Sequence, residues 1–98
     1  MMISIDKSSE MLTLKIEGRL DTVTAPELEK VINEQTDDVK DLVMDMNKLE
    51  YISSAGLRVL LAAQKKMNKV GTMKLVGVCD AVMEVFEMTG FVDILVFE

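Results

Sequence analysis

Apolar and polar side chains alternate near the beginning of the chain. Apolar residues occupy every second position in residues 3–5 and again in residues 12–16. A period of two is typical of strands that bury one face. The polar residues 7–10 between the two runs are few enough for a hairpin loop. We therefore predict a β-hairpin whose second strand ends at Gly18.

The spacing then changes to that of a helix. Apolar side chains recur at three- and four-residue intervals over residues 28–32, which predicts a helix that continues to about Gln35. Thr24 and Glu27 have the spacing of a capping box, in which each side chain accepts a hydrogen bond from the other residue's backbone N–H. Pro26 suits the first turn, where its missing N–H costs nothing.

Three later apolar runs predict further strands. Residues 42–46 and 73–78 show little alternation, which indicates strands buried on both faces, as in parallel sheets. Residues 94–97 predict a short last strand.

Helical patterns separate these strands. One helix is predicted from Ala55 to Lys69, and another begins with Asp80 as its N-cap and stops at Gly90. The predicted order is ββαβαβαβ, an α/β fold with an initial β-hairpin followed by parallel strands joined by helical crossovers in one mixed sheet. No linker-like stretch interrupts the pattern, so residues 1–98 are interpreted as one domain.

Composition and charge narrow the classes of partner. The chain has 98 residues, of which 49% are hydrophobic, and its formal net charge is −6. Nucleic-acid binding requires a basic surface, and anionic membranes repel an acidic one. No run approaches the roughly 20 apolar residues of a membrane span. We therefore expect neither a nucleic-acid partner nor a membrane partner.

The residue types also argue against an enzyme. Histidine is absent and Cys79 is the single cysteine, which excludes Ser-His-Asp and Cys-His catalysis and the usual zinc sites. The glycine-rich motifs that cradle phosphates are missing as well. We expect no catalytic residue, no metal and no cofactor. The lone cysteine and the lack of a signal-peptide pattern at the start favour a cytoplasmic location.

Residues 45–58 stand out because they follow a buried strand and lead into a helix, where functional loops of α/β sheets gather. Ser53 or Ser54 is expected to cap that helix through its hydroxyl. Gly56 costs a helix about 1 kcal/mol relative to alanine, and its expected use is to let another backbone or a ligand approach. A phosphate on a serine here would change the surface without refolding, since a helix N-terminus tolerates negative charge.

The segment Tyr51-Ile52-Ser53-Ser54-Ala55-Gly56-Leu57 resembles the motif of bacterial anti-sigma factor antagonists, which are single STAS domains. The resemblance covers essentially the whole chain. Its supporting elements are residues 18–21, residues 26–28, Asp45 at an expected strand end, and residues 90–91.

The resemblance implies a binding switch. Members of this family bind an anti-sigma factor that is also a serine kinase, which frees a sigma factor. The kinase phosphorylates the antagonist and so releases it, and a serine/threonine phosphatase resets the cycle. The implied phosphoacceptor is Ser54, with Ser53 as the alternative because many members have aspartate there. The implied partner-binding residues are Asp21, Thr22, Ser53, Ala55, Gly56, Leu57 and Arg58.

One alternative stays open at this point. STAS domains also serve as non-phosphorylated interaction modules in sensory or lipid-transport complexes, and such a module would share the fold and the helix start.

Overall fold

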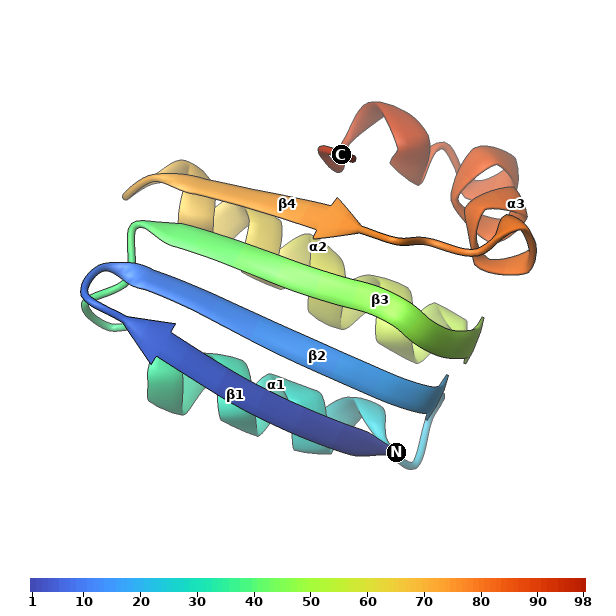
Figure 1. Ribbon diagram of the computed structural model, residues 1–98. Helices are drawn as coiled ribbons and strands as arrows, with labels where there is room; N and C mark the ends of the chain where they lie inside the picture. The colour runs from blue at the N-terminus through green and yellow to red at the C-terminus, as the bar shows by residue number, and fades with distance from the viewer.

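The computed structural model describes residues 1–98, which fold into one four-stranded sheet with the strand order β1-β2-β3-β4 (Figure 1). Strand β1 pairs with β2 in antiparallel fashion, and β2, β3 and β4 are parallel. The predicted α/β class, with an initial hairpin and parallel strands joined by helices, is confirmed. The elements are β1 (Met2–Ser8), β2 (Met11–Leu20), α1 (Ala25–Gln35), β3 (Asp41–Ile52), α2 (Ser54–Asn68), β4 (Thr72–Val76), α3 (Asp80–Thr89) and the 3₁₀ helix η1 (Phe91–Asp93).

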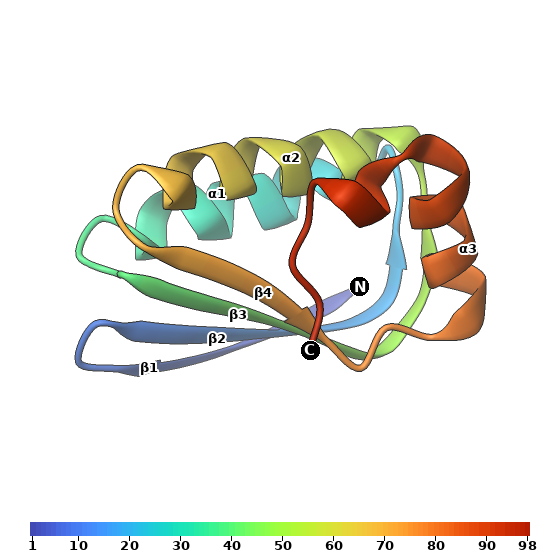
Figure 2. The same ribbon diagram turned by 90° about the horizontal axis from the view of Figure 1, so that it is seen from above.

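Helices α1 and α2 lie side by side on one face of the sheet, and the other face is open (Figure 2). Each crossover from β2 through α1 to β3, and from β3 through α2 to β4, moves one strand further in the same direction. Crossovers of one hand that move in one direction place their helices on the same face. The prediction that residues 42–46 are buried on both faces is therefore wrong. Leu42 and Met44 are buried under the helices, whereas Val43 and Asp45 are only half-buried on the open face.

Strand β3 is longer than its apolar run indicated. The pairing with β2 shifts between Asp45 and Lys48, which marks a bulge, and the strand then continues to Ile52. Asp45 consequently lies within the strand and not at its end. The pairing shifts again between Gly18 and Arg19, where β3 has one extra residue, Glu50. The prediction that Gly18 ends its strand is also wrong, because β2 runs on to Leu20.

The last segment differs from the predicted strand at residues 94–97. It forms η1 and then a single bridge in which Phe97 pairs with Leu75 of β4. Helix α3 has Cys79 at its N-cap, so the prediction of Asp80 as the cap is wrong by one residue. Gly90 ends α3 in a left-handed conformation, as predicted. None of the helices combines the length and apolar character that crossing a membrane requires.

Candidate functional site

Strands β2 and β3 end at the same edge of the sheet, and helices α1 and α2 begin there (Figure 1). The backbone N–H of Ser53, directly after β3, donates a 2.9 Å hydrogen bond to the carbonyl of Leu20 at the end of β2. This bond fixes the β2–α1 turn beside the start of α2. The fold thus brings together the two segments that the sequence indicated, residues 21–22 and 53–58.

The two serines at the start of α2 have different surroundings. Ser53 is the N-cap residue in an extended conformation, and its hydroxyl is buried without a hydrogen-bond partner in the protein. Ser54 is the first residue of the helix and is exposed. No side chain caps α2, so the expected capping hydrogen bond from a serine is wrong even though Ser53 holds the N-cap position. Of the two serines, only Ser54 is exposed to another molecule.

Gly56 is a packing residue and not a place for a ligand to approach. It is buried, and a Cβ atom at this position would lie 2.7 Å from Leu20 Cγ and 2.9 Å from Ile52 Cγ1. The glycine therefore lets the first turn of α2 sit directly on β2 and β3. Leu57 is also buried in the core, whereas Ala55 is half-buried and Arg58 is exposed. Gly56 and Leu57 therefore fix the position of α2 on the sheet. The surface at the start of this helix is formed by Ser54, Ala55 and Arg58.

The turn between β2 and α1 is held by Asp21. Its carboxylate accepts hydrogen bonds from the backbone N–H of Val23 and of Thr24, at 3.0 and 3.1 Å. These bonds, the one from Thr24 above all, hold the pKa of Asp21 below its ordinary value, and the nearby Arg19 adds to the effect.

The expected capping box of α1 is wrong because Thr24 points back toward β2. Its hydroxyl donates to the Arg19 carbonyl at 2.8 Å and accepts from the Asp21 N–H at 2.9 Å. The backbone of Thr24 still begins α1, since its carbonyl accepts from the Glu27 N–H at 3.0 Å.

Arg19 and Tyr51 form a pair that the sequence analysis did not single out. They lie opposite each other in the register of β2 and β3, and the Arg19 guanidinium carbon lies 4.1 Å from the centre of the Tyr51 ring. Such stacking is a cation–π contact. The register depends on the two irregularities in the β2–β3 pairing, which leave no clear signal in the sequence.

A groove of about 240 Å³ runs between the first turns of α1 and α2. Arg58 contributes to its wall and forms no ion pair with any carboxylate. The chain contains two arginines, Arg19 and Arg58, and both lie at this end of the sheet. The groove is lined by Thr22, Ala25, Pro26, Glu29, Ala55, Arg58 and Val59.

The family model of the STAS domain matches residues 2–98. The chain belongs to the STAS domain family. Its sequence is 38% identical over 96 residues to a Bordetella bronchiseptica protein named "Putative anti-sigma factor antagonist BtrV", covering 96% of this chain and 83% of that protein. It is 31% identical over 84 residues to the anti-sigma-B factor antagonist of Staphylococcus aureus, covering 84% of this chain and 78% of that protein.

Solved structures agree with the assignment of this STAS domain. An anti-sigma factor antagonist from Mycobacterium paratuberculosis superposes with a TM-score of 0.88 at 26% identity, over 98% of this chain and 83% of that one. The Bacillus protein SpoIIAA in its phosphorylated form superposes with a TM-score of 0.77 over 99% and 91% of the two chains. At 16% identity, the second likeness is one of fold.

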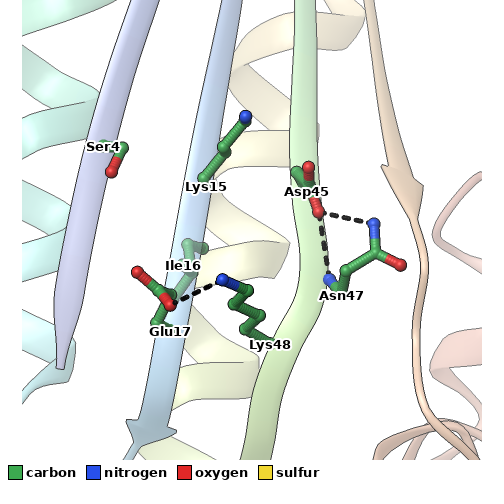
Figure 3. A pocket seen from close by; sticks show the side chains of 7 residues that line it. All are labelled: Ser4, Lys15, Ile16, Glu17, Asp45, Asn47 and Lys48. Carbon is green, nitrogen blue, oxygen red and sulfur yellow. Dashed lines mark hydrogen bonds and ion pairs between the residues drawn. The ribbon is translucent and has the colours of Figure 1, made fainter.

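The open face of the STAS sheet carries a second hollow, of about 150 Å³, lined by charged and polar side chains (Figure 3). Asp45 accepts hydrogen bonds from the backbone N–H and the Nδ2 of Asn47, at 3.0 and 2.8 Å, and these bonds lower the pKa of Asp45. Lys48 lies 3.5 Å from Glu17. No group of three or more His, Cys, Asp or Glu side chains is arranged to hold a metal ion. Ser54 lies beyond the strand ends, so this hollow is separate from the candidate site.

Proposed function

We propose that this STAS domain is an anti-sigma factor antagonist that binds an anti-sigma factor serine kinase and is switched off by phosphorylation of Ser54. The observation that carries the proposal is the contrast between the two adjacent serines: the Ser54 hydroxyl is exposed, and the Ser53 hydroxyl is buried. The names of the curated relatives supply the class of function. The protein acts in this proposal as a cytoplasmic binding partner without catalysis of its own, and a serine/threonine phosphatase restores its active form.

The start of α2 accommodates a phosphate without refolding. A phosphoserine carries about −1.5 to −2 charges at pH 7, and a helix N-terminus offers roughly +0.5 charge with free N–H donors. Since no side chain caps α2, the N–H groups of its first turn remain available. The added charge therefore acts on the docking surface, where it repels a partner that fits the neutral hydroxyl.

The proposed docking surface follows from what is exposed beside Ser54. Thr22 in the β2–α1 turn and Arg58 on α2 are exposed, and Asp21, Ser53 and Ala55 are half-buried around them. Gly56 and Leu57 contribute indirectly, by fixing the position of the helix. A partner that reads Ser54 would contact this surface without disturbing the core.

Phosphate transfer tests the site assignment. The matching kinase and ATP should add one phosphate to the wild type and to Ser53→Ala, and none to Ser54→Ala, as measured by intact-protein mass spectrometry. The two alanine variants are matched, because each removes one serine hydroxyl and the two serines are adjacent. Uptake of phosphate by Ser54→Ala at the wild-type rate would show that the assignment is wrong.

Binding tests the charge mechanism. Ser54→Asp should bind the kinase at least about tenfold more weakly than wild type, which corresponds to about 1.4 kcal/mol, while its urea midpoint stays the same. Ser54→Asn is the control, since it has a similar shape and no charge, and it should keep most of the affinity. Equal affinities of the Asp and Asn variants in a calorimetric titration would contradict repulsion as the cause of release.

A further inference from the structure

We propose that Arg58 is a phosphate-binding residue of this switch: once Ser54 carries a phosphate, the Arg58 guanidinium binds that phosphate across one turn of α2. The inference rests on the proposed function, because it concerns the phosphorylated form of the same serine. It adds a partner for the phosphate within this protein. It also adds a second consequence of phosphorylation, the loss of a free cation from the groove between α1 and α2.

The geometry of the helix favours the pair. Ser54 is the first residue of α2, and Arg58 lies four positions later, so both side chains lie on the same side of the helix. Side chains in a helix lean toward its N-terminus, which directs Arg58 toward Ser54. Both residues are exposed, so the phosphate and the guanidinium can meet without moving the core.

Arg58 is also the arginine that is free to respond. Arg19 already stacks on Tyr51 and lies 3.8 Å from the Asp21 carboxylate. Arg58 has no ion pair, although Glu29 of α1 lines the same groove. A phosphate on Ser54 would be a stronger partner than a single carboxylate, because it has nearly twice the charge and three acceptor oxygens.

The chemistry of the two groups is complementary. A guanidinium presents its N–H donors as a rigid planar fork that matches phosphate oxygens, and such charge-assisted bonds are among the strong ones in proteins. Pairing with the phosphate would hold Arg58 at the start of α2. A partner would then meet a new negative charge and would also lose the cation that lines the groove between α1 and α2.

The test uses phosphoserine placed at position 54 during translation by an engineered tRNA system, so that no kinase is needed. Phosphorus-31 NMR then follows the second ionisation of the phosphate as pH is varied. In the wild type the pKa of this ionisation should lie about 0.3 to 1 unit below that in Arg58→Gln, because the guanidinium favours the dianion. Arg19, Asp21 and Glu29, the charged groups on neighbouring elements, are the same in both proteins.

Lys65→Gln is the matched control, since it removes one positive charge from the last turn of the same helix. It should titrate like the wild type, and Arg58→Lys should lie between the wild type and Arg58→Gln because it keeps the charge without the fork. Coincident titrations of the wild type and Arg58→Gln, with both proteins showing the same urea midpoint, would overturn the inference. That result would leave phosphate transfer to Ser54 intact. A failure of transfer would instead contradict the proposed function, and it would be seen in the mass-spectrometric assay and not in this titration.

Discussion

At the scale of single residues, burial separates positions that the sequence presents as equivalent. Ser53 and Ser54 are identical in type and adjacent, and either could have been the cap or the acceptor. Because β3 continues to Ile52, the extended backbone of Ser53 turns its hydroxyl inward, and the helix begins with Ser54 facing outward. The sequence identified the segment, and the length of the preceding strand decides which hydroxyl is exposed.

Asp21 gives a prediction for pH dependence. Its hydrogen bonds from Thr24 and Val23 lower its pKa in the folded protein relative to the unfolded value of about 3.9. A carboxyl group of this kind contributes stability above its unfolded pKa, and the contribution disappears as pH falls through the folded pKa. In Asp21→Asn, the amide oxygen can still accept both hydrogen bonds but no longer titrates. Its free energy of unfolding should therefore fall less steeply than that of wild type as pH is lowered from about 5 to 2.

Urea unfolding across this pH range measures the effect. Asp6→Asn serves as the control, because the Asp6 carboxylate has no hydrogen-bond or ion-pair partner. The control should follow the wild-type slope. Parallel slopes for wild type and Asp21→Asn would show that the turn does not stabilise the charged carboxyl.

At the scale of elements, regular periodicity predicted helices better than it predicted strand ends. The bounds of α2 were predicted to within one residue at each end, because its apolar spacing is uninterrupted. The extent of β3 was underestimated because the apolar run stops at Met46, and the polar residues Asn47 and Lys48 at the bulge resemble the end of a strand. Thr24 and Asp80 are of residue types that often cap helices, but neither side chain does so here. The Thr24 hydroxyl bonds to the Arg19 carbonyl of β2, and α3 begins one residue earlier than predicted, with Cys79 at its N-cap.

The bulge in β3 also shapes the loop that leads to α3. Asn47, held by Asp45, lies directly over Gly77, where a Cβ atom would fall within 2.2 Å of the Asn47 amide oxygen. Gly77 has a φ of +69°, which costs other residues about 1–2 kcal/mol. We expect Gly77→Ala to lower the free energy of unfolding by about 2–4 kcal/mol, from this strain and the clash together.

Three further variants separate the backbone strain at Gly77 from the clash with Asn47. Gly90 has a similar φ of +81° with no atom within 4 Å of its Cβ position, so Gly90→Ala should cost about 1–2 kcal/mol, from strain alone. Combining Gly77→Ala with Asn47→Ala should restore about 1 kcal/mol or more relative to the sum of the single changes, since the clashing side chain is gone. Urea unfolding of the wild type, the three single variants and the double variant gives these differences. Strict additivity would mean that Asn47 does not restrict the loop.

At the scale of the whole molecule, the arrangement of layers could not be inferred from apolar runs. The runs in β3 and β4 are consistent with helices on both faces, and only the strand order places α1 and α2 on the same face. The open face then carries the charged hollow around Asp45, while the groove beside Ser54 lies where both helices begin. The proposed docking surface is thus a consequence of topology, because one edge of the sheet gathers two strand ends and two helix starts.

The same topology leaves the outer edge of β4 to be covered by the last residues of the chain. The Leu75 N–H donates to the Val96 carbonyl at 2.8 Å, and the Glu98 N–H donates to the Leu75 carbonyl at 3.0 Å. The ring of Phe97 lies 5.5 Å from that of Phe86, which is fully buried. The final segment therefore closes the core beside α3 as well as pairing with the strand.

This arrangement predicts that alanine substitutions at two adjacent positions lower the free energy of unfolding by different amounts. Phe97→Ala should lower the free energy of unfolding by about 2 kcal/mol, less than for a fully buried phenylalanine because the side chain is half-buried. Val96→Ala removes a side chain that is 54% exposed and should cost less than about 0.5 kcal/mol. Both variants keep the backbone bonds to Leu75, so urea unfolding isolates the contribution of the aromatic contact. If the two substitutions cost the same, the last residues would be an attached strand segment and not part of the core.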